Sequence, residues 1–499
     1  MTMSDGTPTG GTGGAGGTGG TVSTGGTVST VSTGSTRGRA LLAASARASL
    51  ALVAAAAAGA LAAGVLFVPG PSVIPTVPAF AVTPDRADQS LVCAGGALGL
   101  TRGADPQVTV VAGARRLSSG TGLVEAALAA SDAIGGGATV VTLPREAPGA
   151  ALAATESVRS ETPELSGLAA AECLTPGRSA WLVGGSTTVG RTTWIVLSNA
   201  DAVDAAVDLR LWGDSGLIEA PGTSGLIVAA GSQRIIPLAG LAVNEPSPVV
   251  QVTSTGGSIA ATLQTSIVRG LTPSGLSIVT PLGEAAERHV IPALPVIAGQ
   301  AALERSTSDG GVDGLPALRM LAPGDDDAQV TVTLVPAQGA VGLVTETTLE
   351  AGVVLDLPFT DLADGEYGVI VESSVPIVVA ARTSTASADA ADVEWFTPSP
   401  ALDAGGETLV AVAPLVDGQS AVLHLLAPEG GAEVTIDGLP ITVPPGFVVV
   451  VPSATNAGVR ISTTGVVHAS ITYRGDGLLA GSRVLPPPSA SSALTVFPY

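Results

Sequence analysis

The sequence predicts an all-β region built from three tandem immunoglobulin-like sandwiches, preceded by a single N-terminal transmembrane helix. Three observations predict it. Short runs rich in Val, Ile and Thr, such as QVTVV (107–111) and VTVTL (330–334), alternate with Gly, Pro and Asp turns. One strand-and-turn pattern occurs three times. An uncharged apolar run of membrane-spanning length precedes the whole region.

The N-terminal tail, residues 1–47, consists mainly of Gly, Thr and Ser and has too few hydrophobic residues to form a core, so we expect it to be disordered. Residues 48–68 then run for 21 positions without a charge, which is long enough to cross a bilayer as a helix. Arg37, Arg39 and Arg47 stand before it, and basic flanks favour the cytoplasmic side. We therefore expect a single-pass protein of the cell membrane whose C-terminal region is extracytoplasmic.

A cleaved signal sequence is the alternative for this apolar run. Residues 79–81 (AFA) fit the small-x-small pattern, and cleavage near Ala81 would release a secreted protein. The run is longer than a typical signal core and ends well before that site, which favours a retained anchor. In either case the Pro-rich stretch 69–89 serves as an extended spacer.

The charge of the chain excludes some partners and chemistries. The formal net charge is −21, and all 21 basic residues are arginine. A negative surface repels nucleic acid, so we expect no nucleic-acid partner. The absence of lysine removes Schiff-base chemistry. The expected partners are the membrane, through residues 48–68, and either an envelope protein or a cell-wall polysaccharide.

The two cysteines, Cys93 and Cys173, both follow the apolar segment. In an oxidising compartment two such cysteines most simply pair, so we expect a disulfide, with two buried free thiols as the alternative. Closing a loop of about 80 residues stabilises a fold by roughly 4–5 kcal/mol in the chain-entropy model. The bond would staple an N-terminal extracytoplasmic region, residues 90–178. The best helical pattern lies in this region, at 122–134 (GLVEAALAASDAI).

The repeat is clearest where a Gly leads into five strand residues and a Pro, at 231–237, 352–358 and 446–452. The Gly suits a turn or bulge entering a strand, and the Pro interrupts ladder pairing at its end. Upstream, LRMLAP (318–323) matches LHLLAP (423–428), with WIVLSN (194–199) as their equivalent in the first copy. Downstream, Ile259, Val378 and His468 align.

Each copy holds about six or seven short strands, which suits an immunoglobulin-like sandwich. We expect the copies at 179–286, 287–398 and 399–484, followed by a C-terminal tail at 485–499.

These motifs, in their order, resemble those of a known family. After Cys173 come WLVGGS (181–186), a strand ending in LSN (197–199), a GDSG turn (213–216) and the Gly-to-Pro strand. With a membrane segment and Cys93 before them, they resemble the actinobacterial large secreted protein family of unknown function (DUF5719-like). The resemblance covers roughly residues 90–485. It implies location and lineage, but no activity and no catalytic residue.

The GDSG stretch also looks like the nucleophile loop of chymotrypsin-like proteases. That chemistry needs a histidine base, which precedes the serine in that fold. His289, His424 and His468 all follow Ser215. Because Asp, Ser and Gly are ordinary turn residues, we expect a turn here and keep a serine hydrolase using Ser215 as a remote alternative.

The histidines are interpreted through the repeat. His468 aligns with Val378 and is expected at a semi-buried strand position. His424 replaces Arg319 and is expected to be a polar, outward-pointing residue. His289 opens a linker strand, and no pair of histidines has metal-ligand spacing. We expect no catalytic, cofactor-binding or metal-binding residue and no cofactor.

Two further groups of residues have structural and functional interpretations. The carboxylates of residues 325–327, with Asp309 and Asp313 nearby, are expected to form a solvated acidic turn, with a weak Ca²⁺ site as the alternative. The tryptophans are expected to fill cores, with sugar stacking as the alternative. They are Trp181, Trp194, Trp212 and Trp395.

The sequence therefore predicts a membrane-anchored, exported cell-envelope protein that is not an enzyme and acts as a structural or interaction platform. The alternative is a polysaccharide-binding or accessory subunit of a cell-wall assembly system.

Overall fold

The computed structural model describes residues 52–59, 80–82, 87–101, 107–130, 137–147, 151–307, 313–337, 342–402, 404–487 and 494–496. The chain divides into two bodies, Met1–Phe80 with Thr495–Tyr499 and Ala81–Leu494. The strands β1 (Phe80–Val82) and β36 (Leu494–Val496) form a two-stranded sheet.

Residues 52–59 of the first body are helical and exposed, and the rest of the predicted 48–68 segment lies outside the described residues, as does the tail 1–47. Within the ranges that the structure describes, no helix has both the length and the apolar character needed to span a membrane.

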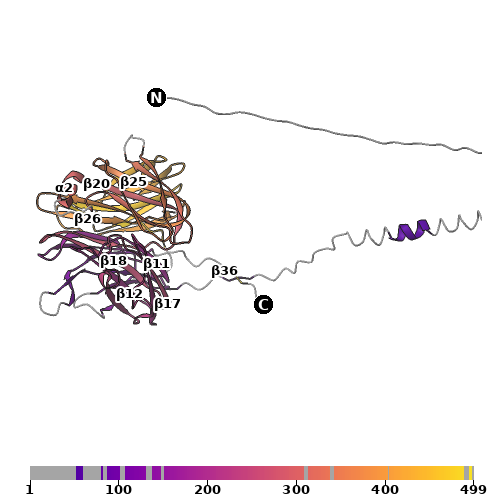
Figure 1. Ribbon diagram of the computed structural model, residues 1–499, viewed down its shortest axis with the longest axis horizontal. Helices are drawn as coiled ribbons and strands as arrows, with labels where there is room; N and C mark the ends of the chain where they lie inside the picture. The colour runs from indigo at the N-terminus through magenta and orange to yellow at the C-terminus, as the bar shows by residue number, and fades with distance from the viewer. Residues whose placement is uncertain are drawn as a thin grey trace, which may run out of the picture. The chain divides into compact units, whose positions relative to one another are not determined.

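The second body is built almost wholly of strands, which confirms the predicted all-β class (Figure 1). Its described helices are η1 (Leu238–Gly240) and α2 (Gly299–Thr307). The strands form sandwiches of two antiparallel sheets, and three of these sandwiches share one strand order. Each has eight strand positions, counted along the chain without the additional short strands of the first and third sandwiches and with the long strand of the second sandwich counted once for each sheet. One sheet joins the first, sixth, third and fourth positions, and the other joins the fifth, second, seventh and eighth.

The first sandwich has the sheets β11-β17-β13-β14 and β19-β18-β12-β16, with β15 also paired to β13. Its strands are β11 (Ser179–Val183), β12 (Arg191–Asn199), β13 (Ala205–Gly213), β14 (Gly216–Ile218), β15 (Leu226–Val228), β16 (Ser232–Pro237), β17 (Val249–Gly256), β18 (Ala260–Arg269) and β19 (Thr272–Val279).

In the second sandwich one long strand, β25, contributes to both sheets. Its first part pairs with β20 and β22, and its second part with β21 and β26. The strands are β20 (Ala286–Val296), β21 (Ala317–Leu321), β22 (Ala328–Pro336), β23 (Val344–Leu349), β24 (Leu355–Pro358), β25 (Gly365–Ala386) and β26 (Ala391–Phe396).

The third sandwich has the sheets β28-β33-β30-β31 and β32-β29-β34, with β35 and β27 also paired to β34. Its strands are β27 (Ala401–Leu402), β28 (Glu407–Val412), β29 (Ser420–Leu426), β30 (Ala432–Ile436), β31 (Leu439–Val443), β32 (Val448–Ser453), β33 (Ala457–Thr463), β34 (Val467–Gly475) and β35 (Leu478–Arg483).

This strand order overlaps only partly with that of immunoglobulin domains. The inner pairs, second with fifth and third with sixth, match the B–E and C–F pairs of that fold. The first strand, however, lies beside the sixth, and the seventh lies beside the second. The terminal strands therefore occupy the opposite sheets from those of an immunoglobulin sandwich.

The N-terminal region contains an incomplete version of the same sandwich, which the sequence did not indicate. In terms of the strand positions of the complete sandwich, the sheet β2-β8-β6 corresponds to first-sixth-third, and the sheet β10-β9-β5 corresponds to eighth-seventh-second. Strands β3 and β4 form an additional pair. Its strands are β2 (Gln89–Cys93), β3 (Ala97–Leu100), β4 (Val108–Ala112), β5 (Arg115–Ser119), β6 (Val124–Ala127), β7 (Ala129–Ala130), β8 (Thr139–Leu143), β9 (Ala153–Glu161) and β10 (Ser166–Glu172).

The predicted helix at 122–134 is wrong. Residues of this segment form β6, which pairs with β8, and β7, which pairs with β16 of the first sandwich, while 131–136 lie outside the described residues. Pairing with neighbouring strands overrides the helix propensity of the alanines, because propensity is a weak preference compared with tertiary contacts.

The four sandwiches form a closed ring through their last strands. β10 packs on β19, β19 on β26, β26 on β35, and β35 again on β10. Asp392, in β26, is 1% exposed and joins these strands. Its carboxylate accepts hydrogen bonds from the backbone N–H groups of Leu168, Leu276 and Leu479, at N–O distances of 2.7, 2.9 and 3.2 Å. The body is thus one assembly of sandwiches rather than a string of them.

The repeat glycines lie at equivalent places, each just before the fifth strand or its entry. Gly231, Gly352 and Gly446 have φ values of +63°, +73° and +69°, which glycine adopts without steric cost. The pairing register corrects the first copy of the sequence alignment by one residue. The prolines at the strand ends lie opposite Trp194, Ala317 and Val422, so Trp194 is equivalent to Ala317 rather than to Leu318.

Two consequences follow from this register. Val196, Arg319 and His424 occupy equivalent positions on the second strand, and His468 is equivalent to Val378 and Ala260 rather than Ile259. The faces they occupy are covered by neighbouring sandwiches, since Arg319 is 1% and His424 0% exposed. The expectation that His424 points outward to solvent is therefore wrong.

Cys93 and Cys173 are joined by a disulfide, with a Cα–Cα distance of 4.3 Å. The bond links β2 to the end of β10, the first and last strands of the N-terminal sandwich, and both cysteines are buried.

Candidate functional site

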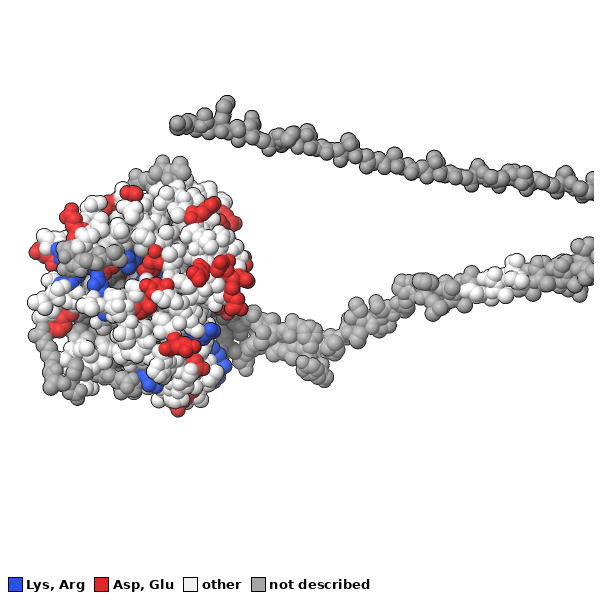
Figure 2. All heavy atoms as spheres, in the orientation of Figure 1, with Lys and Arg blue, Asp and Glu red and all other residues white. Residues whose placement is uncertain are grey.

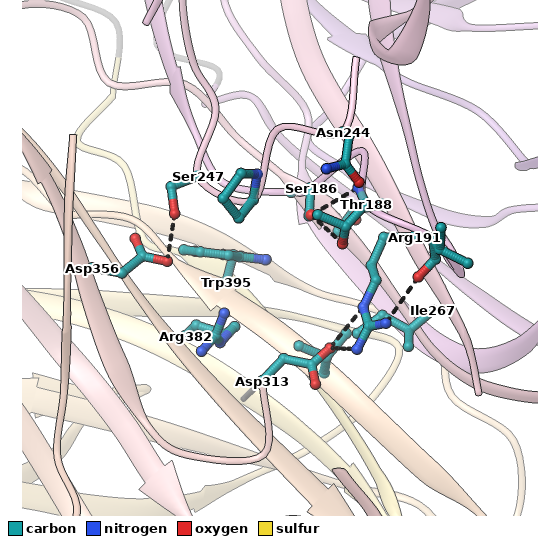
Figure 3. Close-up of a pocket in the computed structure, with 15 residues that line it drawn as sticks. Ser186, Thr188, Arg191, Asn244, Ser247, Ile267, Asp313, Asp356, Arg382 and Trp395 are labelled. Atoms are coloured by element: carbon teal, nitrogen blue, oxygen red, sulfur yellow. Dashed lines mark hydrogen bonds and ion pairs between the residues drawn. The ribbon is translucent and has the colours of Figure 1, made fainter. Parts of the chain in front are cut away.

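A cavity of about 500 Å³ lies between the first and second sandwiches. The first sandwich contributes the loop after β11, the loop before β17 and residues of β12 and β18. The second contributes Asp313, which precedes β21, and residues of β24, β25 and β26. Figure 3 shows the side chains that line it, with Trp395 and Arg382 between the two aspartates.

Two loops with left-handed residues shape the rim of the cavity. Gly185 has φ +76° and Asn244 has φ +54°, a conformation that Gly and Asn adopt most readily. The Ser186 hydroxyl lies 3.0 Å from the Thr188 hydroxyl, and Thr193 donates to the Ser186 carbonyl at 2.8 Å. These bonds hold the hydroxyl groups of Ser186 and Thr188 at the opening.

Asp313 joins the two sandwiches through two arginines of the first one. Its Oδ2 accepts from Arg191 Nη2 at 2.8 Å, and its Oδ1 accepts from Arg269 Nη2 at 2.7 Å. Burial raises the pKa of Asp313, but the charges of Arg269 and Arg191 outweigh burial and lower it to about 2. The carboxylate is therefore ionised at neutral pH.

Arg319 makes the second connection, from the second sandwich to the first. It donates to Asp356 from Nε and Nη2, at 2.8 and 2.9 Å, and to the Gly185 carbonyl at 2.8 Å. Burial raises the pKa of Asp356, and the Arg319 charge more than compensates, so that its pKa is lowered. Ser247 also donates to Asp356, at 3.0 Å.

Trp395 lies in the wall of the cavity, between the ion pair of Asp356 and the ion pairs of Asp313. The guanidinium carbons of Arg319 and Arg382 lie 4.6 and 5.5 Å from its ring centroid. Such contacts place cations over the negative face of the ring. Burial lowers the pKa of Arg382, but an arginine remains charged at neutral pH.

The charges in the cavity lining are balanced. Arg191 and Arg382 line the cavity together with Asp313 and Asp356, whereas Arg269 and Arg319, which pair with these aspartates, do not line it. The whole chain has a net charge of −21, and Figure 2 shows acidic side chains spread over the visible face. The cavity lining thus lacks the net negative charge of the chain that contains it.

The residues considered for catalysis lie apart. Asp214 and Ser215 form the two-residue turn between β13 and β14, and the Ser215 hydroxyl donates to Asp214 at 3.0 Å. His289 bonds to the Ile377 carbonyl and His468 to the Ser399 carbonyl, at 2.8 and 2.7 Å. The structure therefore does not bring the serine together with these histidines.

His424 lies inside a different junction, between the second and third sandwiches. Its Nε2 is 3.0 Å from the Thr472 hydroxyl, and Arg474 beside it donates to Glu366 at 2.8 Å. Burial lowers the pKa of His424 to about 3, and the nearby Arg474 charge acts in the same direction. The imidazole is therefore neutral at physiological pH.

The predicted acidic cluster separates. Residues 325–327 are exposed and Asp313 belongs to the cavity, while Asp309 lies outside the described residues. Within the described part of the chain, no three or more His, Cys, Asp or Glu residues gather in a way that could hold a metal ion.

The tryptophans are buried, as expected for core residues. Trp181 and Trp395 are 6% exposed, Trp194 is 4% and Trp212 is 3%. Trp181 and Trp212 lie 5.2 Å apart, between ring centroids.

Sequence reasoning missed the arginines of the cavity, although one signal was present. Arg319 and Arg382 both interrupt apolar strand runs, RMLAP and VVAARTSTA. Arginine is rarely buried without a partner, so a charge in such a run indicates a buried ion pair. The partner and the junction that brings it close depend on tertiary contacts.

A model of a family of unknown function (DUF5719) matches residues 129–442. No curated protein matches the chain. One similar solved structure is described as "Crystal Structure of Thermotoga maritima 1070". It is 16% identical over 23% of this chain and 93% of that one, with a TM-score of 0.19.

Proposed function

We propose that this chain, which belongs to the DUF5719 family of unknown function, is a non-enzymatic cell-envelope protein that presents a rigid platform of β sandwiches outside the membrane. The observation that carries the proposal is the closed ring of four sandwiches around Asp392. A ring in which each sandwich contacts two others resists the hinge motions that are the default between domains with small interfaces. The proposal includes the predicted relation of these sandwiches to immunoglobulin domains, which is supported by the shared pairing of the second strand with the fifth and of the third with the sixth.

The anchor in this proposal is the apolar segment 48–68. Its length, the arginines before it and the disulfide after it all support an extracytoplasmic body. Secretion after cleavage near Ala81 is the alternative outcome.

Protease treatment of intact, wall-stripped cells tests this topology. We expect protease to remove the body beyond residue 90 and to spare an N-terminal epitope tag, and a lysed sample serves as the control. Protection of the C-terminal body in intact cells would contradict the proposal. Recovery of the body in the medium, with a new N-terminus near Ala81, would favour secretion.

Two observations bear on the alternatives. A polysaccharide-binding role would use exposed aromatic rings, and the four tryptophans are at most 6% exposed. A hydrolase would need a base beside Ser215, whose hydroxyl instead bonds to Asp214. We expect no labelling of Ser215 by a fluorophosphonate probe, and the Ser215→Ala variant should behave as the parent does. Selective labelling at Ser215 would overturn the non-enzymatic proposal.

A further inference from the structure

We propose that a second cleft between the first and second sandwiches binds a small zwitterion, namely an amino acid or a short peptide with a free ammonium group and a free carboxylate. This tryptophan cleft has a volume of about 420 Å³, and its lining includes Trp181, Arg210, Trp212, Asp325 and Asp326. Its lining residues differ from those of the cavity around Trp395. The inference goes beyond the platform function and does not depend on it, because it would hold for an anchored protein and for a secreted one.

One wall of the tryptophan cleft is a sheet of the first sandwich. Trp181 of β11, Gln251 of β17 and Arg210 of β13 lie opposite one another in the pairing register. Directly opposite residues of an antiparallel sheet point to the same face, so these three side chains form one row across three strands. Trp212 follows two positions after Arg210 and therefore lies on the same face. An arginine and two tryptophans thus line one wall together.

The two tryptophans of this wall form a fixed apolar surface. Their ring centroids are 5.2 Å apart, and Trp181 and Trp212 are 6% and 3% exposed. Val375 and Pro376 of the second sandwich add apolar groups to the cleft. Such a surface suits the aliphatic body of a small ligand, which gains free energy when it leaves water. The volume of the cleft lies in the usual range of small-molecule sites.

Arg210 supplies a positive charge that no protein carboxylate neutralises within the part of the chain that the structure describes. Its guanidinium carbon lies 5.1 Å from the Trp212 ring centroid, and the residue is exposed. The planar fork of N–H donors in a guanidinium matches the two oxygens of a carboxylate. An arginine that already rests on an aromatic ring loses less side-chain entropy on binding than a free one does.

The second sandwich places two carboxylates in the cleft, on the loop between β21 and β22. Asp327 fixes this loop, because its carboxylate accepts from the Ala351 backbone N–H at 2.9 Å. The preceding Asp325 and Asp326 both line the cleft, are exposed, and have no hydrogen-bond or ion-pair partner among the described residues. Carboxylates accept charge-assisted hydrogen bonds from an ammonium group. The acidic run therefore supplies the charge that complements the other end of a zwitterion.

The arrangement of these charges selects a zwitterion over a simple ion. The positive group, Arg210, belongs to the first sandwich and the negative groups, Asp325 and Asp326, belong to the second. A ligand with both an ammonium and a carboxylate group pairs with both sides in one orientation, whereas a ligand with one charge pairs with one side only. The acidic run and the tryptophans are far apart in the sequence, and tertiary packing brings them to one cleft.

Isothermal titration calorimetry of the full-length chain tests the proposal with alanine, dialanine and trialanine. We expect saturable binding of at least one of them, and the tightest member identifies the spacing of the two charges that the cleft accepts. The N-acetylated and C-amidated forms of that member each lack one charge. Each should bind at least about tenfold more weakly, because a charge-assisted hydrogen bond is lost.

Variants of exposed residues link binding to this cleft without disturbing a core. Arg210→Gln should weaken binding of the tightest member at least about tenfold, and the double variant Asp325→Asn, Asp326→Asn should do the same. Arg460→Gln is the control for the arginine, since Arg460 is an exposed strand residue of the third sandwich. Asp417→Asn, Asp476→Asn is the control for the aspartates, since both are exposed and the charge change is equal.

The two control variants should bind as the parent does. Equal weakening by a cleft variant and its control would overturn the proposal, because the effect would then follow the net charge of the chain. Absence of saturable binding for all three free peptides and amino acids at millimolar concentration would overturn it as well. A blocked form that binds as tightly as the free one would show that the cleft recognises one charge only, which contradicts the zwitterion assignment.

Discussion

The Asp392 carboxylate accepts a hydrogen bond from the Leu168 backbone N–H at 2.7 Å, although the two residues are 224 positions apart in the chain. The same carboxylate accepts from strands of two further sandwiches and from its neighbour Val393. One buried side chain thus satisfies backbone donors from all four members of the ring.

Replacing Asp392 should destabilise the whole body. Asp392→Ala leaves four buried N–H groups without their acceptor, and each unsatisfied group costs about 1–3 kcal/mol. We expect a total loss of at least about 3 kcal/mol, measured as a lower urea midpoint. Asp392→Asn keeps one oxygen acceptor at the same place and should lose less. An alanine variant as stable as the asparagine variant would show that the junction does not depend on these bonds.

Arg319 and Asp356 should behave as a pair. Arg319→Val leaves the Asp356 carboxylate, whose side chain is 28% exposed, without its main charge partner, which costs up to about 3–5 kcal/mol, the range for a fully buried pair. The equivalent residues in the first sandwich are Val196 and Ile235, so the position accepts an apolar pair. The double variant Arg319→Val, Asp356→Ile should therefore be more stable than Arg319→Val alone. Thermal unfolding of both variants and the parent measures this, and strictly additive losses would contradict the coupling.

The positive φ of Gly352 predicts a purely conformational cost of substitution. A Cβ there would meet nothing within 4 Å, so Gly352→Ala loses stability only through its left-handed backbone, by about 1 kcal/mol. Gly324 is the control in the same sandwich, since it has equal space and no positive φ. Gly324→Ala should be neutral or slightly stabilising. Equal urea midpoints for the two variants would contradict the backbone argument.

The disulfide should make a large contribution to stability. Removing a cross-link that closes about 80 residues costs roughly 4–5 kcal/mol in the chain-entropy model. We expect the Cys93→Ala, Cys173→Ala variant to unfold at lower temperature, with the loss largest in the N-terminal sandwich. Peptide mapping of non-reduced protein should recover the two cysteines linked. Free thiols that react with iodoacetamide in the native exported protein would contradict the pairing.

Glu156 should make stability depend on pH. Burial raises its pKa to about 7, against the lowering effect of the Gly95 backbone N–H and of Arg116. An unfolded glutamate titrates near 4.3, so between about pH 4 and pH 7 the folded state binds more protons than the unfolded state. Stability therefore falls as pH rises through this window, by at most roughly 1.4 kcal/mol per pH unit for this group, and changes no further above it.

The Glu156→Gln variant isolates this contribution. Asp392 and Glu394, whose pKa values burial also raises, change stability in the same direction. The variant therefore keeps the part of the pH dependence of stability that these two groups cause. The difference in unfolding free energy between parent and Glu156→Gln should change steadily between pH 4.5 and pH 7, the range set by the folded and unfolded pKa values. A difference that stays constant across this range would show that Glu156 titrates normally.

Local patterns were sufficient for much of the fold. The Gly-to-Pro strands, the turn at Ser215 and the all-β class depend on near neighbours in the chain, because a positive φ or a strand period needs only a few residues. The disulfide could also be predicted, since the chain has two cysteines and both follow the apolar segment.

The predictions that were wrong concern features that depend on pairing between strands far apart in the chain. The first repeat copy was misaligned by one residue, because strands buried on both faces show no alternation from which to read the register. The 122–134 segment was predicted as a helix from its alanines, and only pairing with β8 and β16 makes it strand. The incomplete N-terminal sandwich keeps the strand order of the other three sandwiches without their sequence motif.

The sequence alone determined the elements of this protein: an apolar segment near the N-terminus, a paired cysteine set and a repeated strand pattern in an acidic chain. Tertiary structure alone decided which faces became interior. Arg319 and His424 occupy outer faces of their own sheets, and only packing against the neighbouring sandwich buries them and requires partners for them. The cavity exists only because the first and second sandwiches meet, since Asp313 of the second sandwich pairs with Arg191 and Arg269 of the first.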